Sequence, residues 1–332
     1  MFENQPPLSL EEGLVETTTG VYDMRDDEQK RRMVSDGLIY YIAEVKAEII
    51  QQDPTALITM GFFAPGAAPD WYVETGSLLE GADLDFFDFH AYPGWETVAE
   101  LVQAFGMNGF ASKPIILGEY GAFQHVYPTL KTAARAITAW QAASCDFGFD
   151  GWLYWAYYPA DESVEDRTWG LVDDSGFFLD MLAPVSHPNP CELVDIPSEN
   201  LAYQKPARAS ASLMENPPAN LVDENASSQW SAGKDAPQWI EIDLGQPYAI
   251  QEIRLLVAQW PEGNTSHRIL GRSRDGNFME LHRFSQSTTE GNWLVFSPED
   301  LIQDIQIVRI ETMSSPSWVA WGEVEIFGEL IP

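Results

Sequence analysis

Three side chains suited to acid–base or nucleophilic chemistry, and two tryptophans suited to stacking on a ligand, follow or lie in three apolar runs. His90 and Tyr92 end the first run, Glu119 ends the second, and Trp152 and Trp155 lie in the third. A pocket-facing glutamate can attack an anomeric carbon when a second carboxylate lies about 5 Å away as acid/base. His and Tyr can orient that glutamate, and an indole can stack on a sugar ring. The alternatives are a carboxylate paired inside a core and a tryptophan that only packs.

Alternating helices and short apolar runs would position these residues. Apolar residues at three- and four-residue spacing predict three helices: Arg25–Gln52, Glu96–Phe105 and Tyr127–Ala143. Apolar composition predicts four buried parallel strands: Thr55–Phe63, Asp85–Tyr92, Pro114–Tyr120 and Gly151–Tyr157. A complete (β/α)8 barrel needs eight such units over about 250 residues, so residues 1–191 predict a truncated α/β (TIM-type) barrel. Because consecutive parallel strands present their carboxyl ends to one side, the chemical residues should converge.

The strand-end sequences Asp-Phe-His-Ala-Tyr-Pro, Ile-Leu-Gly-Glu-Tyr-Gly and Trp-Leu-Tyr-Trp resemble, in order and spacing, strands six to eight of cellulase-like retaining glycosidases. The resemblance covers Pro7–Cys191 and implies barrel strands five to eight. It implies that Glu119 is the nucleophile, that His90 and Tyr92 close strand six, and that Trp152 or Trp155 floors the cleavage subsite. A half-barrel leaves sheet edges unpaired, so truncation of a longer protein is expected, with a stable half-barrel as the alternative.

The acid/base glutamate of that family is not found in this sequence. The family carries it in an Asn-Glu pair ending the fourth strand, whereas Asn4-Gln5-Pro6 has glutamine there. In a second register the Asn-Glu pair precedes Met1, and Glu3 is a third candidate. Without the second carboxylate the chain is expected to hydrolyse glycosides poorly or not at all.

From Ser198 the sequence changes to short alternating runs separated by turn residues, after a proline-rich join at Pro184–Pro197, and the linker between the domains is expected at residues 192–199. This pattern of short alternating runs and turn residues predicts an all-β sandwich over residues 200–330. Strands are expected over four segments: Gln238–Leu244, Ile250–Val257, Ile305–Ile310 and Ala320–Phe327. Asn200-Leu-Ala-Tyr, Asn220-Leu-Val-Asp, Gln238-Trp-Ile-Glu-Ile-Asp-Leu-Gly and the closing Glu323-Val-Glu-Ile-Phe-Gly resemble the discoidin, or coagulation-factor type C, family. The resemblance implies a galactose-binding-like jelly roll that binds carbohydrate.

Bacterial members of the discoidin family often hold a structural calcium ion. The matching oxygen ligands are Asp223, Asn225, Ser228 and Glu323, of the kind that calcium prefers. Glu224 replaces the glycine usual in this loop, so a salt-linked turn without metal is the alternative.

Family members bind ligands at loops on one end of the sandwich. The residues expected there supply one stacking ring and several hydrogen-bonding groups: Trp260, Glu262, Asn264, His267 and Arg268. For Trp260 the alternative is partial packing over the core. For Trp318 a core position is preferred to a place beside the ligand.

Charge and cysteine content restrict the partners and the compartment. With 18 Lys+Arg against 51 Asp+Glu, the formal charge of −33 disfavours nucleic acid and anionic membranes, and suits a polysaccharide or glycan. Cys145 and Cys191 are expected to form a disulfide, the alternative being two free thiols. No apolar run is long enough for a membrane span, and residues 1–7 lack signal-peptide features. An extracellular or cell-surface protein with a truncated N-terminus is expected, the alternative being a cytoplasmic one.

Two functions therefore compete. The first is a fragment of a retaining β-glycosidase, an O-glycosyl hydrolase impaired in catalysis, with an appended sugar-binding module. The second is a non-catalytic carbohydrate-binding or cell-surface adhesion protein.

Overall fold

The computed structural model describes residues 5–63, 80–94, 96–107, 113–159, 161, 167–172 and 175–331. The chain divides into two compact units. The first comprises Met1–Ala122, Ile137–Asp161 and Thr168–Val194, and the second comprises Phe123–Ala136, Glu162–Arg167 and Asp195–Pro332. In the part of the chain described, no helix is long and apolar enough to cross a membrane.

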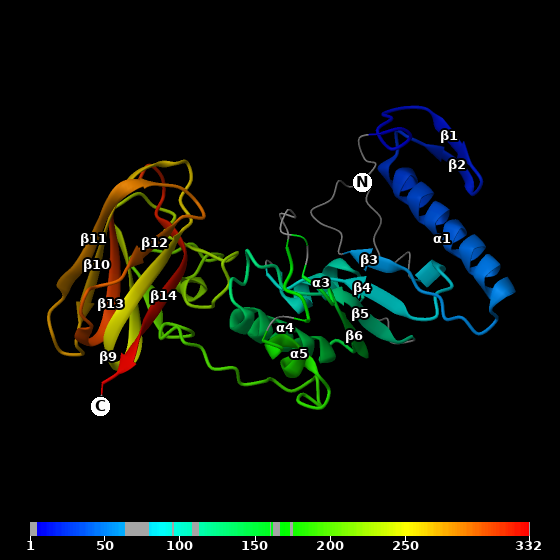
Figure 1. Ribbon diagram of the computed structural model, residues 1–332. Helices are drawn as coiled ribbons and strands as arrows, with labels where there is room; N and C mark the ends of the chain where they lie inside the picture. The colour runs from blue at the N-terminus through cyan, green and yellow to red at the C-terminus, as the bar shows by residue number, and fades with distance from the viewer. Residues whose placement is uncertain are drawn as a thin grey trace. The chain divides into compact units, whose positions relative to one another are not determined.

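The first unit contains a parallel sheet in the order β3-β4-β5-β6 (Figure 1). These strands are Gly61–Phe63, Phe87–His90, Ile115–Tyr120 and Gly151–Tyr154. The helices are α1 (Asp27–Gln52), α3 (Val98–Ala104), α4 (Leu130–Cys145) and α5 (Phe177–Leu182), and a hairpin precedes them as β1 (Leu14–Thr17) and β2 (Gly20–Asp23). The first seven residues of α4, 130–136, belong to the second unit. All four expected strands are present, each shorter than predicted. A small parallel sheet is therefore observed, and the glycosidase half-barrel stays a proposal.

One face of the parallel sheet packs against helical elements. Phe89 of β4 lies 4.3 Å, ring centroid to ring centroid, from Phe105 at the end of α3, and Tyr154 of β6 lies 5.3 Å from Phe178 of α5. Leu153, the residue before Tyr154 in β6, lies on the opposite face of the sheet and is exposed. Alternate side chains of a strand point to opposite faces, so Trp152 shares the helix-covered face with Tyr154.

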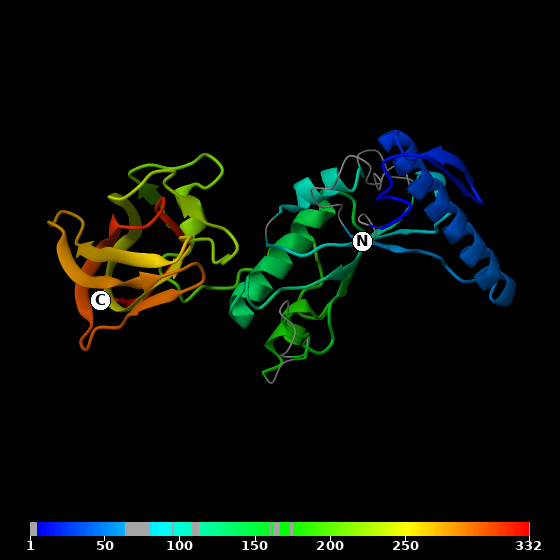
Figure 2. The ribbon, with the colours of Figure 1, turned by 90° about the horizontal axis from the view of Figure 1, so that it is seen from above.

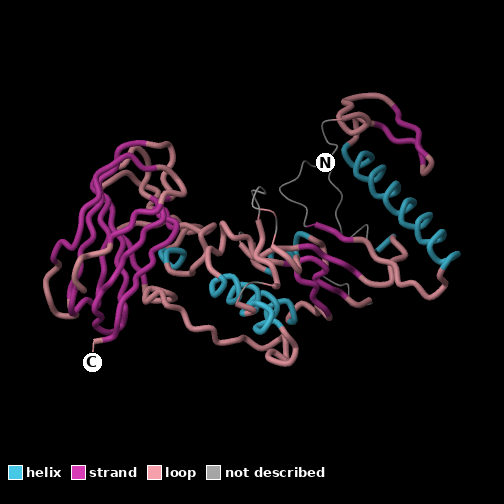
Figure 3. The backbone as a smooth tube through the Cα atoms, in the orientation of Figure 1, coloured by secondary structure: helices cyan, strands magenta, loops and turns pink. Residues whose placement is uncertain are grey.

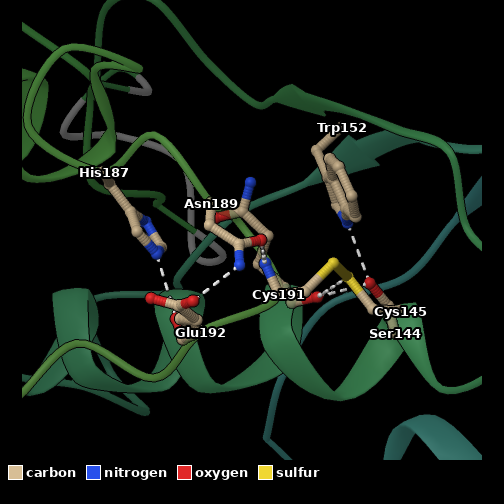
Figure 4. The surroundings of a disulfide bond; sticks show 8 residues. Ser144, Cys145, Trp152, His187, Asn189, Cys191 and Glu192 are labelled. Atoms are coloured by element: carbon tan, nitrogen blue, oxygen red, sulfur yellow. Dashed lines mark hydrogen bonds between the residues drawn. A yellow bond between two sulfur atoms is a disulfide. The ribbon is translucent and has the colours of Figure 1, made fainter.

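A disulfide joins Cys145, the last residue of α4, to Cys191, with 5.7 Å between the two Cα atoms (Figure 4). Of the two alternatives left open by the sequence, the structure contains the bridge. Beside it, Trp152 Nε1 donates a hydrogen bond of 2.8 Å to Ser144 Oγ (Figure 4). The bridge therefore ties the exit segment of the first unit to the helix that covers this face of the sheet.

The second unit is an all-β sandwich built on an eight-stranded sheet with the order β11-β10-β13-β9-β14-β8, in which β7 and β12 also pair with β9 (Figures 1 and 3). The short elements are β7 (Ala207–Ala209), the 3-10 helix η1 (Pro218–Leu221), β8 (Trp230–Ser231) and β12 (Trp293–Phe296). The long strands are β9 (Gln238–Val257), β10 (Gly263–Arg272), β11 (Met279–Thr288), β13 (Ile302–Ser314) and β14 (Ala320–Leu330).

Strand β9 pairs with strands of both layers of the sandwich, which Figure 2 shows from above. Its first part pairs with β7 and β13, and its last part pairs with β12 and β14. The sequence predicted two separate strands over this segment, whereas the structure has one continuous strand. The core between the layers is apolar and closed by two fully buried indoles, Trp230 and Trp321.

His267 belongs to this core and not to the ligand-binding loop in which the sequence placed it. Its side chain is 4% exposed, its Nδ1 lies 3.0 Å from Thr312 Oγ1, and its ring lies 4.6 Å from that of Trp321. Thr265, His267 and Ile269 alternate inward along β10, which explains the burial. Burial lowers the pKa of His267 to about 4.

His267 should make the sandwich less stable in acid. Its folded-state pKa lies below its unfolded value of about 6.5, so its contribution is complete above pH 6.5 and is lost as pH falls toward 4. We expect the free energy of unfolding of wild type, relative to His267→Gln, to fall by roughly 2–3 kcal/mol between pH 7 and pH 4.5. Urea titrations of both proteins at the two pH values measure this difference. A difference that does not change with pH would contradict a neutral buried imidazole.

Candidate functional site

A carboxylate cluster stands at the carboxyl end of the parallel sheet in the first unit. The register of β4 and β5 pairs His90 with Glu119. Tyr92 Oη donates a short hydrogen bond to Glu119 Oε1, and His90 Nδ1 lies 3.2 Å from Glu119 Oε2. The structure thus brings together the three residues that the sequence selected as nucleophile and orienting groups.

The surroundings of Glu119 hold its two neighbours in place. Burial, and then the hydrogen bond to Glu119, raises the pKa of Tyr92, so the phenol stays protonated and donates. On its far side His90 Nε2 lies 3.5 Å from Asp88 Oδ1, and burial raises the pKa of that carboxyl group. Glycine makes room for both side chains: a Cβ on Gly61 would lie 2.5 Å from His90 Nε2, and one on Gly118 would lie 1.8 Å from Asp88 Oδ1.

The two tryptophans of the third strand separate. Trp152 donates a hydrogen bond to Ser144 of α4 on the helix-covered face of the sheet (Figure 4). It therefore does not lie in the cluster around Glu119. Trp155 follows the strand end, is 50% exposed, and donates its backbone N–H to Tyr120 O at 2.7 Å. A Cβ on Gly121 would lie 2.2 Å from Trp155 O and 3.3 Å from the Tyr92 ring, so only glycine lets these two residues approach. Trp155 is therefore the tryptophan near the cluster.

The structure describes only one of the acid/base candidates at the start of the chain. Glu3 and Asn4 lie outside the described residues, and Gln5 is exposed. Asp88 is a second carboxylate on the opposite side of His90, but it lies on the strand before His90, and not beyond the strand end where a substrate would lie. Asp88 is thus suited to orient the imidazole.

In the second unit, two carboxylates, one exposed and one buried, mark the loop that the sequence assigned to calcium. The exposed one, Asp223, accepts hydrogen bonds from Ser228 Oγ (2.9 Å) and from the Asn225 backbone (3.0 Å), and desolvation by the surrounding protein atoms raises its pKa to about 6. Glu323 of β14 is 2% exposed, and its carboxylate lies beside the Asp223 carboxyl group and the Glu224 backbone N–H. Burial, then the charge of Asp223, raises the pKa of Glu323 well above its usual value.

The side chains of the four predicted calcium ligands do not all lie together. Asp223, Ser228 and Glu323 lie together, whereas the Asn225 side-chain oxygen accepts hydrogen bonds from Ser227 N and Oγ at 3.0 and 2.6 Å. Among the described residues, no group of three or more His, Cys, Asp or Glu side chains could hold a metal ion. The loop therefore offers two carboxylates and a hydroxyl, which are hard oxygen donors.

Glu224 accommodates the backbone turn that glycine usually makes. Its φ of 59° is in the left-handed region, which costs a non-glycine residue about 1–2 kcal/mol. Its carboxylate forms short contacts with Arg135 and Ser198 Oγ, and the Arg135 guanidinium lies 4.9 Å from the Tyr203 ring centroid. A buried ion pair thus holds the strained residue, all within the second unit.

A hollow of about 490 Å³ opens at one end of the sandwich and is flanked by two exposed indoles. Trp260 is 73% exposed and Trp318 is 55% exposed. Polar side chains complete the lining: Gln229, Ser231, Asp235 and Ser317. The pairing of β9 with β14 explains why the two indoles lie at the same hollow. Val257 pairs with Trp321, Trp260 lies three residues after Val257, and Trp318 lies three residues before Trp321.

The other residues predicted for this loop lie elsewhere or at its edge. Arg268 pairs with Glu311 and Glu280 across neighbouring strands, so its charge is neutralised within the sheet. Glu262 accepts a 3.2 Å hydrogen bond from Ser287 Oγ, and Asn264 is exposed at the start of β10. Of the five predicted residues, only Trp260 lines the hollow.

Trp318 was expected in the core and instead lines the hollow. Its neighbourhood, Ser314-Ser-Pro-Ser-Trp318, contains turn-forming residues that could have indicated a loop. Asp235 likewise lies in a Gly-Lys-Asp-Ala-Pro turn sequence. No sequence pattern indicated that these two turns and the Trp260 loop share one end of the sandwich.

Comparison with solved structures gives matches that cover about two fifths of this chain. One is chitosan-binding module 1 of a chitosanase/glucanase from Paenibacillus sp. IK-5, with 21% identity over 39% of this chain and 98% of that chain and a TM-score of 0.33. Another is the fucose-binding module SpX-3 of Streptococcus pneumoniae, with 22% identity over 40% and 98% and a TM-score of 0.34. A third is the family 32 carbohydrate-binding module of Clostridium perfringens NanJ in complex with galactose, with 16% identity over 37% and 93% and a TM-score of 0.32.

Two further comparisons concern sequence. No curated protein matches this chain. Residues 206–325 match the model of the F5/8 type C domain family, and this range spans every strand from β7 to the middle of β14. The sandwich of this chain is an F5/8 type C domain.

Proposed function

We propose that this protein binds carbohydrate through the hollow between Trp260 and Trp318. The observation that carries the proposal is the exposure of two indoles on one hollow with four polar side chains. Exposed aromatic surface of this kind is costly in water and marks a binding site. An indole stacks on the apolar face of a pyranose, while hydroxyl, amide and carboxylate groups fix the sugar hydroxyls. The F5/8 type C domain and the net charge of −33 fit an uncharged glycan.

Removing either indole should weaken glycan binding without unfolding the sandwich. We expect Trp260→Ala and Trp318→Ala each to reduce affinity by about five- to a hundredfold, since a stacked ring contributes about 1–3 kcal/mol. A glycan array selects the ligand, and isothermal titration calorimetry measures its dissociation constant.

Trp293 of β12 supplies the matched control because it is a partly exposed tryptophan outside the hollow. Trp293→Ala should leave the affinity unchanged. Equal loss of affinity in all three variants, or loss of melting temperature in Trp260→Ala with intact binding, would contradict the proposal.

We infer that a structural calcium ion would be held by Asp223, Glu323 and the hydroxyl of Ser228. The fit rests on Glu323, which is 2% exposed and lies beside the Asp223 carboxyl group, since a buried carboxylate next to a second acid needs a compensating charge. A cation would supply that charge and lower the pKa of both carboxyl groups. With the Asn225 side chain engaged by Ser227, backbone oxygens and water would complete the coordination.

Calcium should raise the melting temperature of the sandwich, because the ion binds the folded loop and not the unfolded chain. We expect about 1–3 kcal/mol of added stability at millimolar calcium, reversed by chelation. Differential scanning calorimetry of the full chain with calcium and with EGTA measures it. Glu323→Gln, which keeps the size of the side chain, should abolish the response. A melting curve insensitive to calcium would leave the loop as a metal-free turn.

A second candidate function follows from the cluster around Glu119, which resembles the nucleophile site of retaining glycosidases. A Glu119 oxygen would attack the anomeric carbon as the bond to the leaving-group oxygen breaks, giving a glycosyl ester and a leaving alkoxide. Tyr92 and His90 would orient the carboxylate. Without an identified acid, an alkoxide leaving group would not be protonated, so ordinary glycosides should not turn over.

Activated glycosides bypass the need for an acid. We expect 2,4-dinitrophenyl 2-deoxy-2-fluoro-β-glucoside or the corresponding mannoside to label Glu119, because dinitrophenolate departs without a proton. Mass spectrometry of a proteolytic digest detects the ester. Glu119→Gln should give none, and Tyr92→Phe should slow labelling by roughly ten- to a hundredfold. Absence of labelling by both reagents would count against a functional nucleophile.

An extracellular or cell-surface location is part of the proposal. The Cys145–Cys191 disulfide supports it, because disulfides persist in oxidising compartments.

A further inference from the structure

A second hollow adjoins the one flanked by the two indoles. It has a volume of about 200 Å³ and lies between the turn at Glu290 and Gly291 and the loop at Ser227 and Ser228. The two hollows share lining residues Gln229 and Ala258, so they are contiguous. Its lining differs from that of the first hollow in holding no aromatic side chain.

The strands set the distance between the hollows. Ala320 of β14 lines the first hollow, and Gly322 lines the second. Two residues along an extended strand advance about 7 Å, which is comparable with the size of one sugar ring. The turn beside the second hollow is fixed to β9, because Gly291 N donates to Val257 O at 2.9 Å and Val257 N donates to Asn292 O at 2.9 Å. The second hollow is therefore a built feature of the sandwich.

Each hollow contains one carboxylate, Asp235 in the first and Glu290 in the second. Neither lining, within the described residues, includes a Lys, Arg or His side chain. A uronic-acid or sulfated chain would meet uncompensated like charge here, whereas sugar hydroxyls or ammonium groups would find acceptors. The lining thus favours neutral sugars and amino sugars over acidic ones.

We propose that the two hollows form one groove for a glycan chain of at least two neutral or amino-bearing sugar units. One unit stacks between Trp260 and Trp318, and the next is held by hydrogen bonds with Glu290, Gln229 and neighbouring backbone groups. This inference rests on the proposed carbohydrate binding and specifies its ligand as a chain and not a single terminal sugar.

Chain-length dependence tests the groove. The full chain is titrated calorimetrically with β-1,4-linked glucose, galactose, N-acetylglucosamine and glucosamine, each as one to four units, and with galacturonic acid oligomers as the acidic counterpart. We expect affinity in at least one neutral or amino series to rise about tenfold or more from one unit to two, and galacturonate oligomers to bind most weakly.

Glu290→Ala should lower the affinity for two units about fivefold without changing that for one unit. Glu290→Lys should weaken glucosamine oligomers further and improve galacturonate oligomers. Glu299→Ala, at an exposed site outside both hollows, is the matched control and should change nothing. In contrast, Trp260→Ala should weaken every length equally.

The outcomes separate this inference from the proposed function. Equal affinity for one and four units, with Trp260→Ala still weakening both, overturns the groove while carbohydrate binding stands. A preference for galacturonate overturns the ligand class. Failure of every series, together with an array that shows no glycan bound, overturns both.

Discussion

The pairing of strand β9 with both β13 and β14 is the constraint on which the sandwich and its candidate site depend. Strand β9 is twenty residues long, and its first and last parts lie in different layers. The register of its pairing therefore fixes which loops meet. The pair Val257–Trp321 closes this register at one end. Both loops leaving it carry an indole outward, while Trp321 itself is buried against His267. The same register therefore separates structural from exposed aromatic side chains.

The sequence predicted much of this sandwich because strand alternation and turn residues are local signals. The prediction that His267 lies in the ligand-binding loop was wrong, because His267 alternates inward with Thr265 and Ile269 along β10. The prediction for Trp318 was also wrong, because an isolated tryptophan carries no local sign of the face on which it lies. Gln229 and Asp235 were missed since their neighbourhood with Trp260 arises from pairing between distant strands.

In the first unit, too, the sequence predicted features set by neighbouring residues and missed those set by contacts between residues distant in sequence. The meeting of His90, Tyr92 and Glu119 followed from parallel strands with aligned carboxyl ends. The choice between Trp152 and Trp155 did not, because an aromatic-rich strand lacks the apolar–polar contrast that assigns faces. The hydrogen bond from Trp152 to Ser144 and the exposure of Trp155 separate the two residues. Glu224 is a further case: its left-handed backbone is compatible with glutamate because Arg135, distant in sequence, neutralises the buried charge.

Carbohydrate binding at the indole-flanked hollow is the central claim, and the indole N–H signals of the folded protein test it most directly. ¹⁵N-labelled tryptophan gives one side-chain resonance for each indole, assigned by single Trp→Phe variants. On titration with the glycan chosen by the array, the Nε1–H resonances of Trp260 and Trp318 should shift with a common dissociation constant. Those of the buried Trp230 and Trp321 should move least. Saturable binding that leaves Trp260 and Trp318 unshifted would contradict the account.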